Sequence, residues 1–85
     1  MSITSRERML LHWIIKRYDH SAGATNIAPA DLRTEAGVTP EEFAEAVSSL
    51  TREGYLDQAT QDDTDGTWLL VPSDRGVLTA MGLAD

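Results

Sequence analysis

Apolar residues near the N-terminus recur at every third or fourth position, at Leu10, Leu11, Ile14, Ile15 and Tyr18. This spacing is typical of an amphipathic helix and predicts one over about residues 5–19. Thr4 and Glu7 have the spacing of a capping box, in which each side chain binds the other residue's backbone N–H at the start of a helix. A polar loop that contains Gly23 follows the predicted helix.

A short strand and a short helix are predicted next. Residues 24–27 form the candidate strand. The helix covers about Pro29–Ala36 with Leu32 toward the core, because proline suits the first turn of a helix. Gly37 stands where a left-handed glycine commonly ends one.

A third helix follows almost at once. Thr39 is its predicted cap, Pro40 lies in its first turn, and Glu42 completes a second capping box. The helix runs to about Glu53. Its apolar face has helical spacing and consists of Phe43, Ala46, Val47 and Leu50.

The C-terminal third of the chain predicts a β-hairpin and one more short helix. The strands are residues 55–60 and 67–71, and Asp65-Gly66 is a strong turn signal between them. On the second strand, Trp68 and Leu70 point to one face while Leu69 and Val71 point to the other. Ser73 caps the last helix, which covers about Asp74–Met81.

Together these elements predict a single α+β domain over residues 1–85, with three core helices, a hairpin and a short C-terminal helix. The chain has no cysteine, so neither a disulfide framework nor a thiolate metal site is expected. No apolar run approaches the roughly 20 residues that a membrane-spanning helix needs. No signal peptide is recognisable, and we expect a cytoplasmic protein.

Three segments, in this order, resemble the winged-helix family of DNA-binding domains. They are Asp31–Thr39 around the helix-turn glycine, Leu50–Leu56 with its Gly-Tyr-Leu end, and Pro72–Gly76 at the start of the last helix. The resemblance covers nearly the whole chain and implies a winged helix-turn-helix fold, with the hairpin as the wing.

The resemblance also implies a binding site, because the third helix of such domains usually enters the major groove of DNA while the wing contacts the backbone or minor groove. The residues that match in the third helix are Thr39, Pro40, Glu41, Glu42, Ala44, Glu45, Ser48 and Ser49. Those that match in the wing are Asp62, Asp63, Asp65 and Gly66.

The charge of these positions is unusual for a DNA-binding surface. The chain carries a net charge of −7, and residues 34–85 hold two basic and eleven acidic residues, a net of −9. Neither predicted binding segment contains Lys or Arg, although phosphate contacts need both. Two simpler interpretations stay open: Glu41 and Glu42 complement the helix dipole, or the host has a high-salt cytoplasm in which acidic surfaces are general.

The first predicted helix is different, because it gathers the basic residues Arg6, Arg8, Lys16 and Arg17. These form either a solvated face or a set of phosphate contacts. Met9 and Trp13 lie on the same side, away from the main apolar stripe. They either pack against the C-terminal helix or form a surface for self-association, where Met and aromatic residues are enriched.

Catalysis and cofactor binding find little support. His12 and His20 are eight positions apart, which is not the spacing of a helical metal pair. The acidic run at residues 62–65 lacks the terminal glutamate of a calcium-binding loop. We therefore expect no enzymatic activity, no cofactor and no metal.

Two functions are left. The first is a small transcription regulator that binds duplex DNA through the third helix and the wing, as a dimer formed by the first helix or the C-terminal segment. The alternative is an acidic protein-interaction module that docks on a basic protein surface. An inhibitor that mimics DNA would be the extreme case of that alternative.

Overall fold

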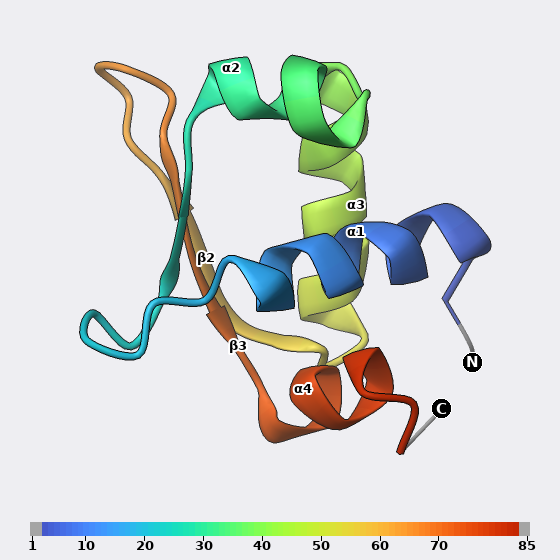
Figure 1. Cartoon of the computed structure of the whole chain (residues 1–85). Helices are drawn as coiled ribbons and strands as arrows, with labels where there is room; N and C mark the ends of the chain where they lie inside the picture. The colour runs from blue at the N-terminus through green and yellow to red at the C-terminus, as the bar shows by residue number, and fades with distance from the viewer. Residues whose placement is uncertain (1–2, 84–85) are drawn as a thin grey trace.

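An antiparallel sheet packs against helices in the computed structural model, which describes residues 3–83 (Figure 1). This α+β domain has four α-helices and a three-stranded sheet within that range. Its elements are α1 (Ser5–Lys16), β1 (Thr25–Ile27), α2 (Pro29–Asp31), the π-helical turn η1 (Leu32–Ala36), α3 (Pro40–Arg52), β2 (Leu56–Gln61), β3 (Trp68–Pro72) and α4 (Asp74–Ala80).

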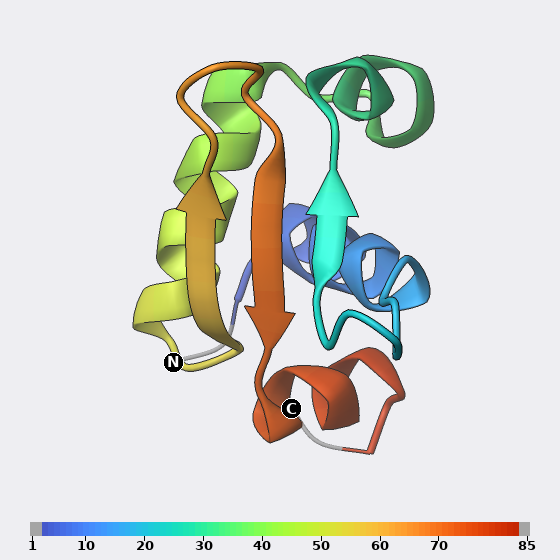
Figure 2. The same cartoon turned by 90° about the vertical axis from the view of Figure 1, so that its left-hand side faces the viewer.

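The strand order is β1-β3-β2, so the last strand of the chain lies in the centre of the sheet (Figure 2). Leu70 is paired with Thr25 of β1 on one side and with Ala59 of β2 on the other. The predicted hairpin is therefore confirmed. A shift in register between Leu56 and Gln58 bends the start of β2.

Helix α1 ends three residues earlier than the predicted limit at residue 19. The Asp19 side chain accepts a hydrogen bond from the backbone N–H of Ser21 at 2.9 Å, and the backbone of Asp19 bridges to Ala24. Such a local turn competes with the helix for the same backbone groups. Tyr18 consequently lies outside α1 and is half-buried.

The predicted helix at Pro29–Ala36 exists, but its second half widens into a π-helical turn. The N–H groups of Gly37 and Val38 both bind the carbonyl oxygen of Leu32, the latter at 3.1 Å. Gly37 has a φ of 69°, the left-handed conformation expected of a glycine that ends a helix. Thr39 follows shortly after this turn and caps α3 as predicted.

Phe43 of α3 is the centre of the core. Its fully buried ring makes edge-to-face contacts with Trp13 of α1 at 6.2 Å and with Trp68 of β3 at 5.7 Å between centroids. The Trp13 ring thus packs on α3, a contact that the predicted packing against the C-terminal helix did not include. Leu70 is fully buried, whereas Leu69 on the opposite face of β3 is exposed.

Helix α4 packs through small residues rather than through its large apolar ones. Gly76 and Thr79 are buried, while Leu78 and Met81 are exposed. Gly76 lies so close to the backbone just before β2 that an added Cβ would be 2.1 Å from the carbonyl oxygen of Tyr55. Ser73 accepts a hydrogen bond from the Gly76 N–H and donates one to the Gly54 carbonyl, which fixes this close approach.

Gly76→Ala should therefore destabilise the fold, because the new methyl group meets backbone that cannot rotate away. We expect a loss of roughly 1–3 kcal/mol or more in the free energy of unfolding, measured by urea denaturation. Gly82→Ala is the matched control: an added Cβ there meets nothing within 4 Å, and only the strain of its φ of 78° applies. Equal losses in the two variants would contradict the close packing at Gly76.

Candidate interaction face

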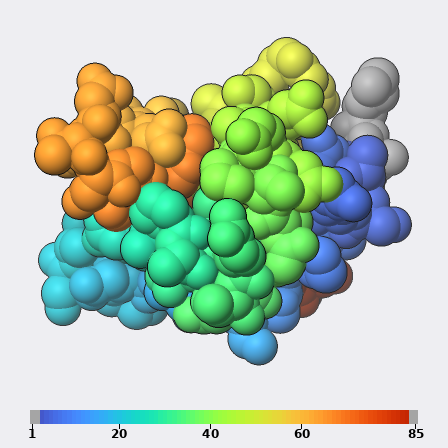
Figure 3. Space-filling view, turned by 90° about the horizontal axis from the view of Figure 1, so that it is seen from above, coloured from blue at the N-terminus to red at the C-terminus, as the bar shows by residue number. Residues whose placement is uncertain are grey.

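The start of α3, the α2–η1 segment and the wing lie on one face of the molecule, shown in Figure 3. The wing is the loop of residues 62–67 between β2 and β3. Its Gly66 lies against α2, since an added Cβ would be 3.1 Å from Cγ of Pro29. We call this surface the α3–wing face.

The residues of α3 that the sequence placed in the binding site point in different directions. Thr39, Pro40, Glu41, Glu45 and Ser48 are exposed, while Ala44 is half-buried. Glu42 instead interacts with α1 through its ion pair with Arg6, and Ser49 is half-buried. The outward surface of α3 is thus formed mainly by Glu41, Glu45 and Ser48.

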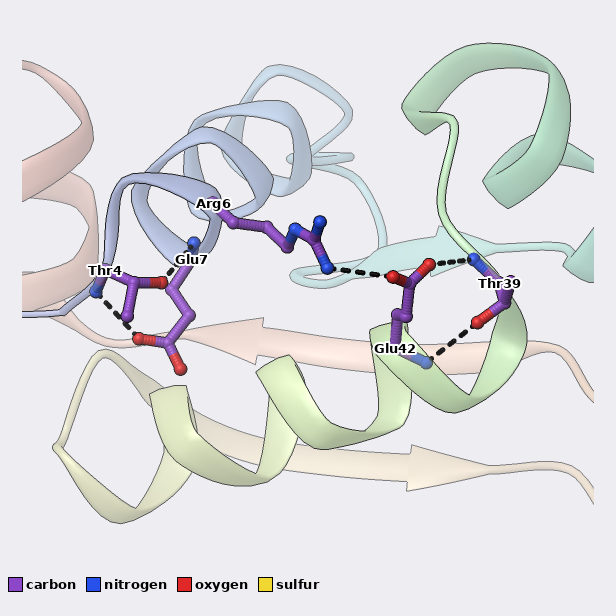
Figure 4. A network of polar contacts seen from close by, with 5 residues as sticks. All are labelled: Thr4, Arg6, Glu7, Thr39 and Glu42. Atoms are coloured by element: carbon purple, nitrogen blue, oxygen red, sulfur yellow. Dashed lines mark hydrogen bonds and ion pairs between the residues drawn. The ribbon is translucent and has the colours of Figure 1, made fainter.

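Glu42 joins two helices through both of its carboxylate oxygens (Figure 4). Oε1 accepts a hydrogen bond from the Thr39 N–H at 2.9 Å, and Oε2 accepts one from Nη1 of Arg6 at 2.8 Å. The Thr39 hydroxyl accepts the Glu42 N–H at 3.1 Å, which completes the predicted capping box. The backbone hydrogen bond from Thr39, followed by the charge of Arg6, lowers the pKa of Glu42. Glu42 is therefore part of the framework that holds α3.

Two of the three wing aspartates also have structural roles. Oδ1 of Asp62 accepts the Thr64 N–H at 2.7 Å, and Oδ1 of Asp65 accepts the Thr67 N–H at 2.9 Å. The hydrogen bond from Thr67 lowers the pKa of Asp65, so this carboxylate stays ionised. The repeated Asp-x-Thr pattern is the sequence signal for these turns.

The basic residues of α1 are partly neutralised by acidic neighbours. Arg17 binds Asp31 at 3.0 Å and Glu35 at 2.6 Å, and its guanidinium lies 5.4 Å from the centroid of the Trp13 ring. Arg17 therefore ties α1 to α2 and η1 rather than forming part of a solvated basic face. No local spacing could have indicated this, because its partners are 14 and 18 positions away.

Within residues 3–83, the charged side chains without partners on the α3–wing face are three carboxylates and one cation, Arg33 of η1. Within residues 3–83, Glu41, Glu45 and Asp63 form no hydrogen bond or ion pair. The cations nearest in sequence are Arg33 on η1 and Arg52 at the end of α3, and both are exposed. The face consequently combines an exposed helix surface with carboxylates of α3 and of the wing.

The proposed self-association residues, Met9 and Trp13, differ in exposure. Trp13 is half-buried between Phe43 and Arg17. Met9 is exposed and lies beside the end of α4, where both line a shallow hollow. Only Met9 of this pair is thus well placed for contact with another molecule.

Comparison with protein-family models, with curated proteins and with solved structures finds no match to this chain. Among the described residues, none of the helices has the length and hydropathy needed to cross a membrane. Across the same part of the chain, no three His, Asp or Glu side chains are grouped closely enough to bind a metal ion. The function must therefore be argued from the α3–wing face itself.

Replacing Glu42 tests whether its charge supports the fold. A lowered pKa in the folded state means that ionised Glu42 is stabilising above the ordinary glutamate pKa, and that this contribution disappears as the pH falls through the lowered value. Glu42→Gln keeps the capping geometry but loses the charge. We expect it to lower the urea midpoint at neutral pH and to reduce the loss of stability on acidification.

Glu41→Gln is the matched control, because Glu41 is the adjacent carboxylate in the same helical turn and has no partner among residues 3–83. Its effect on the same two measurements should be smaller. If both variants behave alike, only the helix dipole is being measured and the Arg6 ion pair contributes nothing.

Proposed function

We propose that this chain is a winged-helix domain. Support comes from the order of its elements, in which β1 separates α1 from the α2–η1 and α3 pair and a hairpin follows. The sheet order β1-β3-β2 brings the wing to the same side as the start of α3 (Figure 2). This is the arrangement that the sequence resemblance implies.

We further propose that the α3–wing face docks on a basic protein surface. The observation that carries this proposal is which charged side chains are paired within the chain and which are not. Arg6 and Arg17 are engaged by carboxylates of the same chain, whereas Glu41, Glu45 and Asp63 point outward without partners in the described structure. A surface of this kind attracts Lys and Arg side chains and repels phosphates.

Charge complementarity would act chiefly on the rate and the specificity of docking. Opposite charges steer two proteins together, and exposed ion pairs contribute about 0.2–1 kcal/mol each. The exposed carboxylates lie on structured elements, since Asp62 and Asp65 hold the wing loop and Glu42 holds the start of α3. The face therefore presents its charges in a fixed arrangement at little entropic cost.

Duplex DNA is the second candidate, favoured by the exposed start of α3 near the wing and by the exposed cation Arg33 on η1. A glutamate of α3 could accept a hydrogen bond from cytosine N4. Binding would then depend on a small number of cations, and phosphates would pass close to Glu41 and Glu45.

A titration followed by NMR amide shifts distinguishes these functions, with a decalysine peptide and a 20-bp duplex as separate probes at low salt. We expect the peptide to shift amides of the first half of α3 and of the wing. Glu41→Gln/Glu45→Gln should weaken peptide binding roughly 2- to 30-fold, because two exposed ion pairs are lost.

The matched control is Asp57→Asn/Asp74→Asn, which removes the same charge from exposed positions outside the face. An equal effect of both double variants would mean that only net charge matters, as for a generally acidic surface. Duplex binding that shifts the same amides would instead support DNA as the ligand.

A further inference from the structure

Strand β2 forms one edge of the sheet (Figure 2). It pairs with β3 on one side, and within residues 3–83 no strand pairs with its other side. Edge strands are commonly protected by lysine, by proline or by a bulge, which discourage pairing with a further strand. Residues 56–61 contain neither Lys nor Pro, and the bulge lies at the start of β2, between Leu56 and Gln58. The part of β2 that leads to the wing is therefore unprotected.

The hydrogen-bond pattern indicates which backbone groups face this edge. The Asp62 N–H binds the Thr67 carbonyl oxygen at 2.8 Å, so these residues form a hydrogen-bonded pair of the antiparallel ladder. Such pairs alternate with non-hydrogen-bonded ones, and Ala59 and Gln61 belong to the latter. Their N–H and C=O groups point away from β3, and in the described structure they form no other backbone hydrogen bond. An added strand would provide the missing partners.

A hollow lies beside the same edge, between β2 and α3. Its volume is about 430 Å³, and it is lined by Ala59 and Trp68 of the sheet and by Val47, Ser48, Thr51 and Arg52 of α3. Ala59 is paired with Leu70, whose side chain is fully buried, so the Ala59 side chain also faces α3. A residue opposite Ala59 on an added strand would project its side chain to the same side. That side chain would enter the hollow.

The charges around the edge indicate which side chains such a strand carries. Thr60 and Asp62 follow one another on the outer face of the sheet and are exposed, and Asp63 beside them has no partner in the described structure. The wing holds no Lys or Arg. Arg52, the cation that lines the hollow, belongs to α3 on the inner face. Basic side chains are therefore favoured on the outer face, and an apolar one is favoured toward the hollow.

We propose that β2 binds an extended basic segment of the protein partner as a fourth strand, with one large apolar side chain in the hollow. This inference rests on the proposed docking function and specifies what the partner presents. Hydrogen bonds to Ala59 and Gln61 provide affinity, and the hollow selects the apolar residue. Because β2 leads directly into the wing, one partner can contact this edge and the α3–wing face together.

The peptide Thr-Lys-Thr-Lys-Leu-Lys-Thr-Lys-Thr, blocked at both ends, is a suitable probe of the full chain. Its lysines alternate with the leucine, so they lie on the outer face when the leucine faces α3. It should bind roughly tenfold more tightly than the same peptide with threonine in place of leucine, since the leucine leaves water. Calorimetry measures both affinities. In NMR spectra, the Ala59 and Gln61 amides should shift and exchange more slowly with solvent.

Two N-methylated forms of the leucine peptide test the backbone hydrogen bonds separately from charge and side chains. One is methylated at its odd-numbered residues and the other at its even-numbered residues. Only alternate N–H groups of a strand face a given neighbour. One form should therefore lose binding while the other retains it, whichever direction the peptide runs.

Ala59→Leu tests the hollow from the protein side, because the larger side chain fills it. It should weaken binding of the leucine peptide roughly tenfold. Ser48→Leu, from the α3 side of the hollow, is the second variant, used if Ala59→Leu fails to fold by circular dichroism. Thr60→Leu is the matched control, since it adds the same residue to β2 with its side chain on the outer face. It should leave the affinity nearly unchanged.

Equal affinity for the leucine and threonine peptides, or equal responses to the two methylation patterns, would overturn the proposal. So would protection of the Ala59 and Gln61 amides that rises with the concentration of the free protein, because a second copy would then occupy the edge. If decalysine shifts the α3 and wing amides while the leucine peptide fails these tests, the docking function stands and only the strand addition is wrong. If decalysine fails while the leucine peptide passes, the edge binds a segment and the acidic face does not.

Discussion

The edge-to-face contacts of Phe43 with Trp13 and Trp68 are the interaction on which the rest of the fold depends. They connect α1, α3 and the central strand β3, elements that are distant in the sequence. Because the ring is fully buried, the opposite side of α3 must face outward. The position of Phe43 thereby determines that Glu41, Glu45 and Ser48 lie on the exposed side of α3.

Some acidic residues of the chain stabilise its fold, and others are exposed without a partner in the described structure. The net charge does not distinguish these two groups. Glu42, Asp62 and Asp65 hold backbone N–H groups at the start of α3 and in the wing, and Glu42 also binds Arg6. Asp31 and Glu35 bind Arg17 and keep α2 and η1 against α1. These contacts leave Glu41, Glu45 and Asp63 as the unpaired carboxylates of the α3–wing face within residues 3–83. These ion pairs neutralise Arg6 and Arg17 together with the carboxylates that bind them, so the charge of the face comes from residues outside the pairs.

Local patterns were sufficient to predict much of this fold. The Thr4–Glu7 and Thr39–Glu42 spacings predicted both capping boxes, and Gly37 predicted the end of the second helix. The early end of α1 was missed because an aspartate turn replaced helical hydrogen bonds at Asp19. The partners of Arg6 and Arg17 could not be predicted, since their contacts depend on how helices pack and not on local spacing. The same holds for α4, where Gly76 rather than Leu78 meets the core.

The central claim is that the α3–wing face has a negative potential that its own chain does not neutralise. Paramagnetic relaxation by matched cationic and anionic cosolutes measures this potential at each backbone amide, without any partner. The account predicts that the cationic probe relaxes the amides of Glu41, Glu45 and Asp63 more strongly than the anionic probe, and that this preference exceeds that of α1 amides at Met9 and His12. Equal relaxation by the two probes across α3 and the wing would contradict the account.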